Sequence, residues 1–355
     1  MTLTQDPGCA ASAPVAGVPP TTRRKGLPLV ARIGVAIVVI VVGMLIAPSL
    51  SSQDLYIGTA ILAWSLVASS LNIVVGYAGQ LNLAQGGFLA VGAYVGVLGT
   101  GRWHWAGLLT LAVAAGSAYV VATLLGRIIF RAKGLHFALL TTGITIVVYN
   151  ILIVWTDVTG GAAGISTAGP IEEGGVISPL TVLGVSIESA VDWFRVMLIC
   201  LVLLVLALTV VNRRKRGVSW RAIRDNEVLG ASVGVDVAKG KRSAFVASSV
   251  LASVVGVLYG HWLGFITPGS FNFAEASFGP LAMVIIGGAG TLLGPIIGAV
   301  IVIGAPEMFR DLDSVSTLVY GAVLLLVVIL APKGIVGVVK ELLRKAWTAT
   351  RKDRP

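Results

Sequence analysis

The sequence predicts an all-α fold, a polytopic bundle of transmembrane helices with both chain termini on the cytoplasmic side. Three observations lead to this prediction: the apolar composition, the recurrence of long apolar windows and the placement of the basic residues. The chain has 355 residues, of which 56% are hydrophobic and 12% are charged, and its mean hydropathy is +0.93. Soluble domains carry roughly 25% charged residues, so this composition indicates a membrane protein.

Apolar windows of roughly 20 residues, the length that crosses a bilayer as a helix, recur along the chain. The clear windows are about eight in number, at 28–49, 55–76, 83–100, 106–128, 136–156, 193–212, 243–265 and 315–332. A further apolar region, 280–304, is interrupted by Gly287, Gly288, Gly290, Gly294 and Pro295. The 44 glycines suit close helix packing in lipid, where small residues let backbones approach.

The basic residues set the predicted orientation. They gather before the first window, in the turn near 127–133, in the loop 213–242 and in the tail. Between Lys133 and Arg195 there is no Lys or Arg, whereas five acids occur: Asp157, Glu172, Glu173, Glu188 and Asp192. Lys and Arg near span ends favour the cytoplasm, so 157–192 is expected outside. The net charge of +10 is thus explained by topology and gives no indication of a nucleic-acid partner.

This orientation constrains the interrupted region 280–304. Residues 266–279 are expected outside and the tail inside, so the window 315–332 has to run inward. A single crossing by 280–304 would leave the tail on the wrong side. We therefore expect a segment that enters and leaves on the external side, as a re-entrant hairpin or as two short helices broken near Gly287–Gly290.

The stretch Asn72–Val95 is the one around which the chain is organised. An apolar run breaks on Gly76 and Gly79, and three carboxamides follow within six residues: Gln80, Asn82 and Gln85. Carboxamides are costly in hydrocarbon, and non-helical backbone is tolerated there only where protein covers it or water reaches it. The stretch is either part of a polar pathway or a tight cytoplasmic turn with its amides in water; spacing alone favours neither.

The interrupted region repeats a short pattern from this stretch. A shared G-x-A-G-x-L aligns residues 76–81 with residues 287–292. Paired glycine-interrupted segments in two halves of a chain point to a central pathway in inverted-repeat transporters. On the predicted topology one break faces the cytoplasm and the other faces outside. A match this short among glycines also arises by chance.

The loop 213–242 has the pattern of a capped amphipathic helix. Ser219 is a plausible N-cap, Gly234 a stop and Asp236 the cap of the next helix. The expected apolar face is Trp220, Ile223, Leu229 and Ala231, and the expected exposed residues are Arg221, Arg224, Asp225 and Glu227. Such a helix can dock in a groove of a soluble partner. A solvated basic loop that fixes topology and touches lipid headgroups is the simpler alternative, slightly favoured by the physics alone.

Several activities are disfavoured. The segment GVDVAKGKR at 234–242 has the wrong glycine spacing for a phosphate loop, and Arg242 stands where Ser or Thr is needed. No charged residue lies well inside a clear window, and ion-coupled carriers often keep such a carboxylate. The same absence argues against a membrane enzyme or a metal site. We expect no cofactor in this chain, and energy supplied by another chain.

Four motifs together resemble one family. They are NIVVGYAGQLNLAQGGFLAVGAYV, TGGAAGIS (159–166), RAIRDNEVLGASVGVDVAKGKRSAF (221–245) and IIGGAGTLLGPIIGA. In this order they are similar to the permease subunits of branched-chain amino-acid ABC importers, and the longer of the two paired permease types fits best. The resemblance covers roughly residues 30–340. Here Val228 and Leu229 stand where alanines are frequent in the family, which leaves the docking contacts of the loop open.

The resemblance implies a domain organisation and a set of partners. Residues 28–340 would form the permease domain, 1–27 a disordered cytoplasmic extension and 341–355 a basic cytoplasmic tail. The partners would be a shorter homologous permease, two cytoplasmic ATPase subunits that hydrolyse ATP with Mg²⁺, and an external solute-binding protein that delivers leucine, isoleucine or valine. The chain would be no enzyme itself and would lie in the inner membrane of a bacterium.

The resemblance and the residue patterns together give candidate site residues. The substrate pathway would involve Asn72, Gly76, Gly79, Gln80, Asn82, Gln85, Gly287 and Gly290. The ATPase coupling residues would be Arg221, Ala222, Asp225, Asn226, Glu227 and Gly234. Glu172 and Glu173 are candidate contacts for the binding protein or, more simply, solvated acids. The competing functions are a urea or short-amide ABC permease of the same superfamily, a self-sufficient secondary carrier and a structural membrane anchor.

Overall fold

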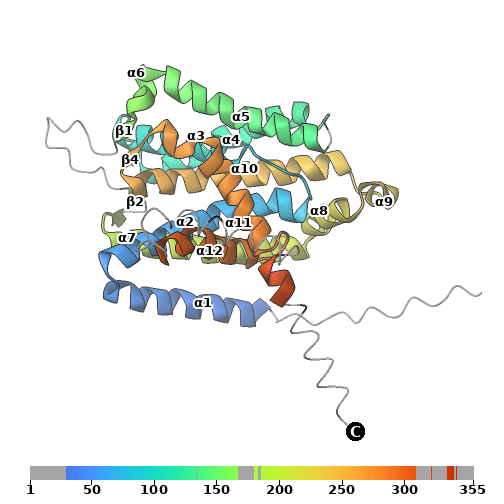
Figure 1. The fold of residues 1–355 in the computed structure, drawn as a ribbon, viewed down its shortest axis with the longest axis horizontal. Helices are drawn as coiled ribbons and strands as arrows, with labels where there is room; N and C mark the ends of the chain where they lie inside the picture. Colours follow the sequence, from blue (N-terminus) through green and yellow to red (C-terminus); the bar gives the residue numbers. More distant parts are fainter. Residues whose placement is uncertain are drawn as a thin grey trace, which may run out of the picture.

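The computed structural model describes residues 29–132, 134–166, 180–182, 185–308 and 334–339, with Gly321 and Glu341. Most of the helices run along one common direction, which is horizontal in Figure 1. We call one end of the bundle the strand end, because it holds β1 (Ile165–Ser166) and β4 (Phe265–Ile266). The opposite end is the α8 end, which holds α8 (Lys215–Asp225) and α9 (Glu227–Ser232).

Seven helices form the main body of the described bundle. They are α1 (Leu29–Ile46), α2 (Ser52–Asn72), α3 (Gln85–Gly101), α4 (Gly107–Ile129), α5 (Leu135–Val154), α7 (Ala190–Arg213) and α10 (Val237–Leu263). Two shorter helices, α11 (Gly279–Gly287) and α12 (Gly294–Met308), pack on α2, and α6 (Thr156–Thr159) is a single turn. The strands are short antiparallel pairs: β1 pairs with β4, and β2 (Leu180–Val182) pairs with β3 (Val185–Ile187).

The predicted polytopic helical bundle is confirmed, whereas the predicted number of about eight spans is not. Within the described residues, six segments are long and apolar enough to cross a membrane: Ser52–Tyr77, Gly107–Ile129, Leu135–Val154, Ala190–Arg213, Val237–Leu263 and Pro268–Gly287. The predicted span 83–100 forms α3, which has 17 residues and is buried along most of its length. Apart from Gly321 and Glu341, the predicted span 315–332, the extension 1–27 and the tail 341–355 lie outside the described residues.

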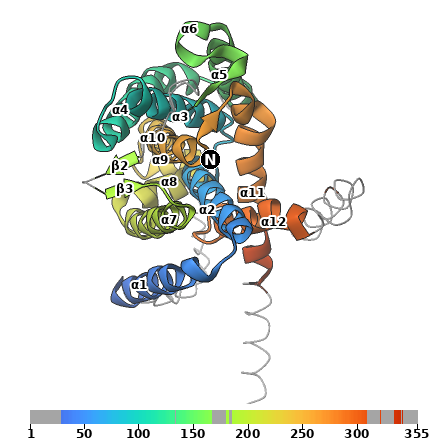
Figure 2. The ribbon, with the colours of Figure 1, turned by 90° about the vertical axis from the view of Figure 1, so that its left-hand side faces the viewer.

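The centre of the bundle is a close pair of helices, α3 and α10. A Cβ on Gly92 of α3 would overlap the Ser253 carbonyl oxygen, and a Cβ on Gly256 of α10 would overlap the Leu89 carbonyl oxygen. Small residues therefore let the two backbones touch, as is common for helices packed in lipid. Figure 2, which looks along the bundle, shows α2 and α10 inside it and α1 at its edge beside α7.

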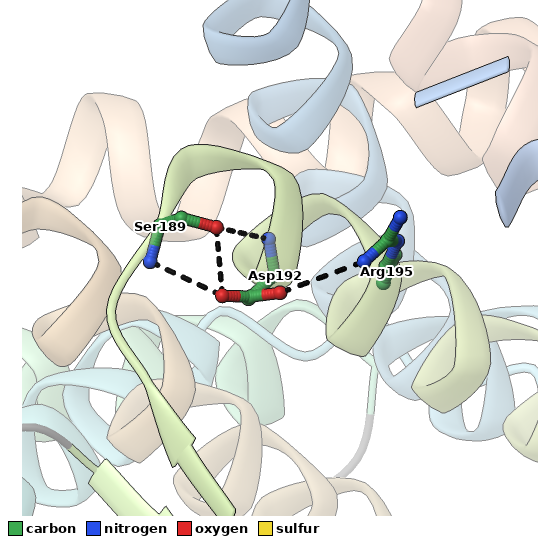
Figure 3. A network of polar contacts seen from close by, with 3 residues as sticks. All are labelled: Ser189, Asp192 and Arg195. Carbon is green, nitrogen blue, oxygen red and sulfur yellow. Dashed lines mark hydrogen bonds and ion pairs between the residues drawn. The ribbon is translucent and has the colours of Figure 1, made fainter. Parts of the chain in front are cut away.

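The start of α7 is fixed by side chains rather than by burial. Ser189 Oγ accepts a hydrogen bond from the Asp192 backbone N at 3.1 Å, and the Ser189 backbone N donates to Asp192 Oδ2 at 3.3 Å (Figure 3). This reciprocal capping box satisfies backbone donors that a helix start leaves free. Arg195 Nη1 lies 3.7 Å from Asp192 Oδ1 and adds an exposed ion pair.

The basic segments gather at one end of the bundle, as the sequence predicts. The α8 end holds the turn after α4, the helices α8 and α9, and the basic start of α10. Gly126 near the end of α4 lies against Arg242 of α10, whose Cγ would be 3.4 Å from a Cβ at that glycine. Asp157, Glu188 and Asp192 belong to segments at the strand end. Such a gathering of basic segments at one end is what the positive-inside rule expects on one side of a membrane.

The interrupted region forms the predicted pair of short helices in a hairpin. It starts beside the β1–β4 pair and runs through α11 to a break at residues 288–293. It then returns through α12 to Glu307, whose Oε1 accepts a hydrogen bond from Gln53 Nε2 at 2.7 Å at the start of α2. Both limbs therefore meet the strand end, and the break is the tip of the hairpin.

The prediction that the two helix breaks face opposite sides is wrong. The tip of the hairpin contacts the break that follows α2, where Asn72 Nδ2 donates a hydrogen bond to the Thr291 carbonyl oxygen at 2.8 Å. The reason is the length of the inward limb. Residues Pro268–Gly287 provide a full crossing length, so the tip reaches the far end of the bundle instead of stopping near the side from which it enters.

Candidate functional site at the two helix breaks

The first break begins with a change of helix type. After Asn72 the chain continues as a π turn, Ile73–Tyr77, and then stays non-helical until α3 begins at Gln85. Single π turns occur frequently at functional sites, because they free or displace backbone groups of an otherwise regular helix. Gly79 has a φ of +69°, a backbone conformation that favours glycine. The break predicted at Gly76 and Gly79 is confirmed.

The second break has a matching conformation. Gly290, which aligns with Gly79 in the shared G-x-A-G-x-L pattern, has a φ of +77°. The repeated sequence therefore corresponds to a repeated left-handed turn, and the resemblance between the two segments extends to backbone geometry. Gly287 forms the last turn of α11, where a Cβ would overlap the Gly294 carbonyl oxygen at the start of α12. This contact lets the hairpin close tightly.

Asn72 joins the two breaks. Its carboxamide donates to the Thr291 carbonyl oxygen and accepts from the Gly290 backbone N, each at 2.8 Å, and the residue is 1% exposed. A Cβ on Gly76 would overlap both Asn72 Oδ1 and the Gly290 nitrogen. One buried side chain thus supplies the hydrogen bonds that the second break loses by leaving the helix, and Gly76 provides the space that this approach requires.

Arg224, from the last turn of α8, lies against both breaks. Its guanidinium Nη1 donates to the carbonyl oxygen of Gly76. A Cβ on Gly79 would lie 3.0 Å from the Arg224 Cγ, and a Cβ on Gly290 would overlap the guanidinium itself. A hydrogen bond with one ionised partner is stronger than a neutral one. The surface helix α8 is therefore attached directly to the broken ends of α2 and of the hairpin.

Arg224 is not among the predicted site residues, because the sequence pattern places it on the exposed face of the helix. It keeps an exposed surface, but its guanidinium points to the breaks. Trp220 is 4% exposed and lies four residues earlier, so the two side chains share one face of α8. That spacing was the signal available: an arginine one turn beyond a buried tryptophan belongs to the inner face of the helix.

Gln80 and Glu227 connect the first break to α9. Gln80 Nε2 donates to Glu227 Oε1 at 3.5 Å, and the same oxygen lies 2.5 Å from Lys241 Nζ. Lys241 is 8% exposed, so its charge is compensated in place by this carboxylate. Glu227, a predicted ATPase contact, therefore has partners within the chain, although 42% of its side chain remains exposed.

The other two amides of the first break are buried. Gln85 is inaccessible; its Nε2 donates to Ser70 Oγ at 2.5 Å, and its Oε1 accepts from Ser248 Oγ at 3.1 Å. Asn82 is 1% exposed, and its Oδ1 accepts from the Ala84 backbone N at 3.0 Å. The alternative of a turn with its amides in water therefore does not describe Asn82 or Gln85. Gln85 is the centre of a polar cluster that connects α2, α3 and α10.

Two hydroxyls complete this cluster at the start of α3. The Gly86 backbone N donates to Ser277 Oγ at 3.0 Å, the Gly87 backbone N donates to Thr145 Oγ1 at 3.3 Å, and the two hydroxyls lie 3.1 Å apart. They satisfy donors that every helix start leaves free. Sequence reasoning missed both residues because a single hydroxyl in an apolar window gives no distinguishing pattern.

The surface loop differs from its predicted form at the start of its helix. The helix α8 begins at Lys215, and Ser219 lies inside it, with its Oγ donating to the Lys215 carbonyl oxygen at 3.0 Å. The predicted N-cap at Ser219 is therefore wrong. Gly217 allows the sharp turn from α7, because a Cβ there would lie 2.5 Å from the Val211 carbonyl oxygen. This turn starts the helix a full turn earlier than the capping pattern indicated.

A second difference is that the loop holds two helices. Asn226 ends α8 and caps α9, its Oδ1 accepting from the backbone N atoms of Val228 and Leu229 at 3.0 Å each. Of the predicted apolar face, Trp220 and Ile223 are buried, whereas Leu229 and Ala231 are exposed because the break at Asn226 turns them outward. The predicted stop at Gly234, with a φ of +86°, and the cap at Asp236 are confirmed.

The remaining predicted coupling residues lie on α8. Arg221 Nη2 donates to the Asn212 carbonyl oxygen at 2.5 Å, which ties α8 to the end of α7. Ala222 is half-buried and Asp225 is exposed. On α9 and directly after it, three large apolar side chains are more than half exposed at the α8 end: Val228 (81%), Leu229 (63%) and Val233 (72%). We call these three residues the α9 patch.

The fold and the breaks define a multi-pass membrane protein in which a surface helix is joined to interrupted helices at one end of the bundle. The family model described as branched-chain amino acid transport system / permease component matches residues 55–331. The chain belongs to this family of permease components, which are not themselves enzymes. No solved structure matches the chain.

Curated relatives agree with the family. The high-affinity branched-chain amino acid transport system permease protein LivM of Salmonella typhimurium is 33% identical over 87% of this chain and 75% of its own length. LivM of Escherichia coli is 32% identical over 81% of this chain and 71% of its own length. The permease protein LivH of Salmonella typhimurium is 26% identical over 77% of this chain and 91% of its own length.

Replacing Asn72 with alanine tests the bridge between the breaks. We expect Asn72→Ala to destabilise the folded protein by about 2 to 4 kcal/mol, because the Gly290 N–H and the Thr291 carbonyl lose buried partners. The measurement is the apparent melting temperature of the detergent-solubilised protein, followed by size-exclusion chromatography. The matched control is Asn150→Ala, an exposed amide on α5 that bonds only its own helix. Equal melting temperatures for the two variants would contradict the bridge.

Replacing Gly76 with alanine tests the close approach at the same point. Gly76→Ala should lower stability and uptake together, since its Cβ overlaps the Asn72 side chain and the Gly290 backbone. Gly143→Ala is the control, because a Cβ at that helical position meets nothing within 4 Å. Thermal unfolding and uptake by cells that express each variant provide the two readouts. Tolerance of alanine at Gly76 comparable to that at Gly143 would contradict the packing described here.

Proposed function

We propose that this chain is a membrane-spanning permease subunit of an ATP-binding-cassette importer for branched-chain amino acids. The family and the names of the LivM and LivH relatives support the substrate class, leucine, isoleucine and valine. In this proposal a solute-binding protein delivers the amino acid at the strand end, and residues 28–340 form the permease domain. The family relationship to LivM and LivH also supports pairing with a shorter homologous permease.

The proposed orientation places the α8 end in the cytoplasm of a bacterium and the protein in the inner membrane. The basic segments at that end support this orientation through the positive-inside rule. Two cytoplasmic ATPase subunits would then dock on the loop 213–242, where ATP and Mg²⁺ would be used by those subunits and not by this chain. The α9 patch supports this docking, because exposed apolar groups at the end of a helical loop favour contact with a partner protein.

The observation that carries the proposal is the position of Arg224. The same helix that would receive force from an ATPase holds the Gly76 carbonyl and lies against Gly79 and Gly290. A displacement of α8 therefore has to move the broken ends of α2 and of the hairpin, or detach from them. In this proposal the contact forms a mechanical path from the α8 end to the helix breaks, and the hydrogen bonds of Asn72 and Gln80 lie along it.

Reconstitution tests the function as a whole. The chain, its shorter permease, the ATPases and the binding protein are placed in proteoliposomes, and uptake of labelled leucine and labelled urea is compared at equal ATP. Leucine uptake that requires all components supports the proposal. Urea uptake without leucine uptake would favour the short-amide permease, and leucine uptake by this chain alone would favour a secondary carrier.

The role of Arg224 yields a specific expectation. Arg224→Gln should leave the ATPases bound but reduce ATP-driven leucine uptake by roughly tenfold or more, because the lost charge-assisted bond disconnects α8 from the breaks. The ratio of amino acid transported to ATP hydrolysed is the measurement. Arg131→Gln, an exposed arginine in the turn after α4, is the control. An unchanged ratio in Arg224→Gln would contradict a coupling role.

The α9 patch yields a second specific expectation, on the binding of the ATPases. Leu229→Glu should weaken co-purification of the ATPases by roughly tenfold or more, because a charge replaces a buried apolar contact in the assembled complex. Leu229→Met keeps the apolar character and should retain binding. Both variants should keep the elution volume of the folded permease, since Leu229 is 63% exposed in this chain. ATPase retention in Leu229→Glu equal to that in Leu229→Met would exclude the patch from the docking surface.

A further inference from the structure

A second polar site lies at the α8 end, apart from the helix breaks. An open cavity of about 790 Å³ lies between α4, the first two turns of α8 and the first half of α10. Its described lining includes Tyr119 and Thr123 of α4, and none of the residues assigned above to the two breaks. Its rim belongs to the loop 213–242, but the α9 patch proposed to meet the ATPases is not part of its lining.

The rim of the cavity is strongly basic. Lys215 and Arg216 come from α8, and Lys239 and Arg242 come from α10. The acid on the rim, Asp236, already accepts a hydrogen bond from the Lys239 backbone N at 2.9 Å as the cap of α10. Within the described part of the chain, none of the four basic side chains forms an ion pair. Four basic side chains thus line the rim, and the single carboxylate there already accepts a hydrogen bond from the backbone. This charge balance favours an anionic ligand.

The inner wall of the cavity is apolar. On α10 the lining continues from Arg242 to Val246, Ala247, Val250 and Leu251, residues that recur at helical spacing on one face and are half-buried. The distance along the helix from Arg242 to Leu251 is about 14 Å at the usual rise per residue. The site is thus basic at the end of the bundle and apolar toward its middle, in the same order as the headgroup and hydrocarbon layers of a bilayer.

We propose that this cavity binds one anionic phospholipid from the leaflet at the α8 end. Its phosphate lies among Lys215, Arg216, Lys239 and Arg242, and one acyl chain lies along the α10 wall. Basic pockets between membrane helices bind anionic headgroups, through charge-assisted hydrogen bonds from Lys and Arg. Thr123 also lines the cavity, and its buried hydroxyl has no hydrogen-bond partner among the described residues.

The apolar wall favours a lipid over a free phosphate ion. A phosphate ion would contact only the basic side chains, whereas a lipid would also place an acyl chain against the wall. The bound lipid would join α8 to α4 and α10 at the point where Trp220 Nε1 donates to Ser243 Oγ at 2.9 Å. The position of α8 would then depend on the composition of the membrane. This inference does not rest on the transport proposal, because lipid retention is measured without substrate or ATP.

The experiment uses the full permease assembly in nanodiscs that contain phosphatidylglycerol and phosphatidylethanolamine in equal amounts. After extraction, the retained lipids are counted by native mass spectrometry for wild type and three variants. Lys239→Gln with Arg242→Gln removes two cations of the rim, and Val246→Trp fills the apolar wall. Arg127→Gln with Arg131→Gln removes two exposed cations at the same end but outside the cavity and is the matched control.

The expected result is retention of phosphatidylglycerol by wild type and control, and a roughly tenfold lower retention when the two rim cations are removed. Val246→Trp should reduce lipid retention to a similar degree. Retention that survives Val246→Trp but is displaced by inorganic phosphate would identify a phosphate site and overturn the lipid. Equal retention in all variants would also overturn it. Loss of a protein subunit from the rim variant with unchanged lipid retention would assign the cavity to a protein interface.

Discussion

The structure depends on the double hydrogen bond between the Asn72 carboxamide and the backbone at Gly290 and Thr291. A helix that is interrupted inside a membrane loses backbone partners, and lipid cannot replace them. Here the break after α2 packs against the break between α11 and α12. The buried Asn72 side chain donates one hydrogen bond to the second break and accepts another from it. Gly76 is the geometric condition for this arrangement, because any side chain there would occupy the position of the amide.

The sequence predicted which residues break the helices but not where the breaks meet. Glycine runs and amides in apolar windows are local signals, so the breaks at Gly79 and Gly290 and the hairpin were accessible from the chain alone. The positive-inside rule assigns the ends of spans to sides of the membrane. It carries no information on how deeply a hairpin enters, so it placed the two tips on opposite sides when they are in contact.

In the surface loop, too, local sequence patterns predicted local features but not contacts with distant segments. Capping patterns identified Gly234 and Asp236, because each acts on backbone groups only a few residues away. They failed at Ser219, where the tight turn at Gly217 and the preceding helix determine where α8 begins. Arg224 could be placed on the inner face of α8 only by combining the helical spacing with the burial of Trp220, and its partner, a backbone carbonyl of α2, has no signature in the sequence.

The polar groups of the bundle fall into two classes, and the distinction bears on how such a site can open. Asn72 and Gln85 are buried and bonded, so separating the helices that they join costs hydrogen bonds. Ser65 and Ser69 on α2 and Ser249 on α10 are buried with hydroxyls that have no partner among the described residues. Buried hydroxyls of this kind gain hydrogen bonds when water reaches them. Opening along these faces would therefore regain part of the free energy lost at the amides.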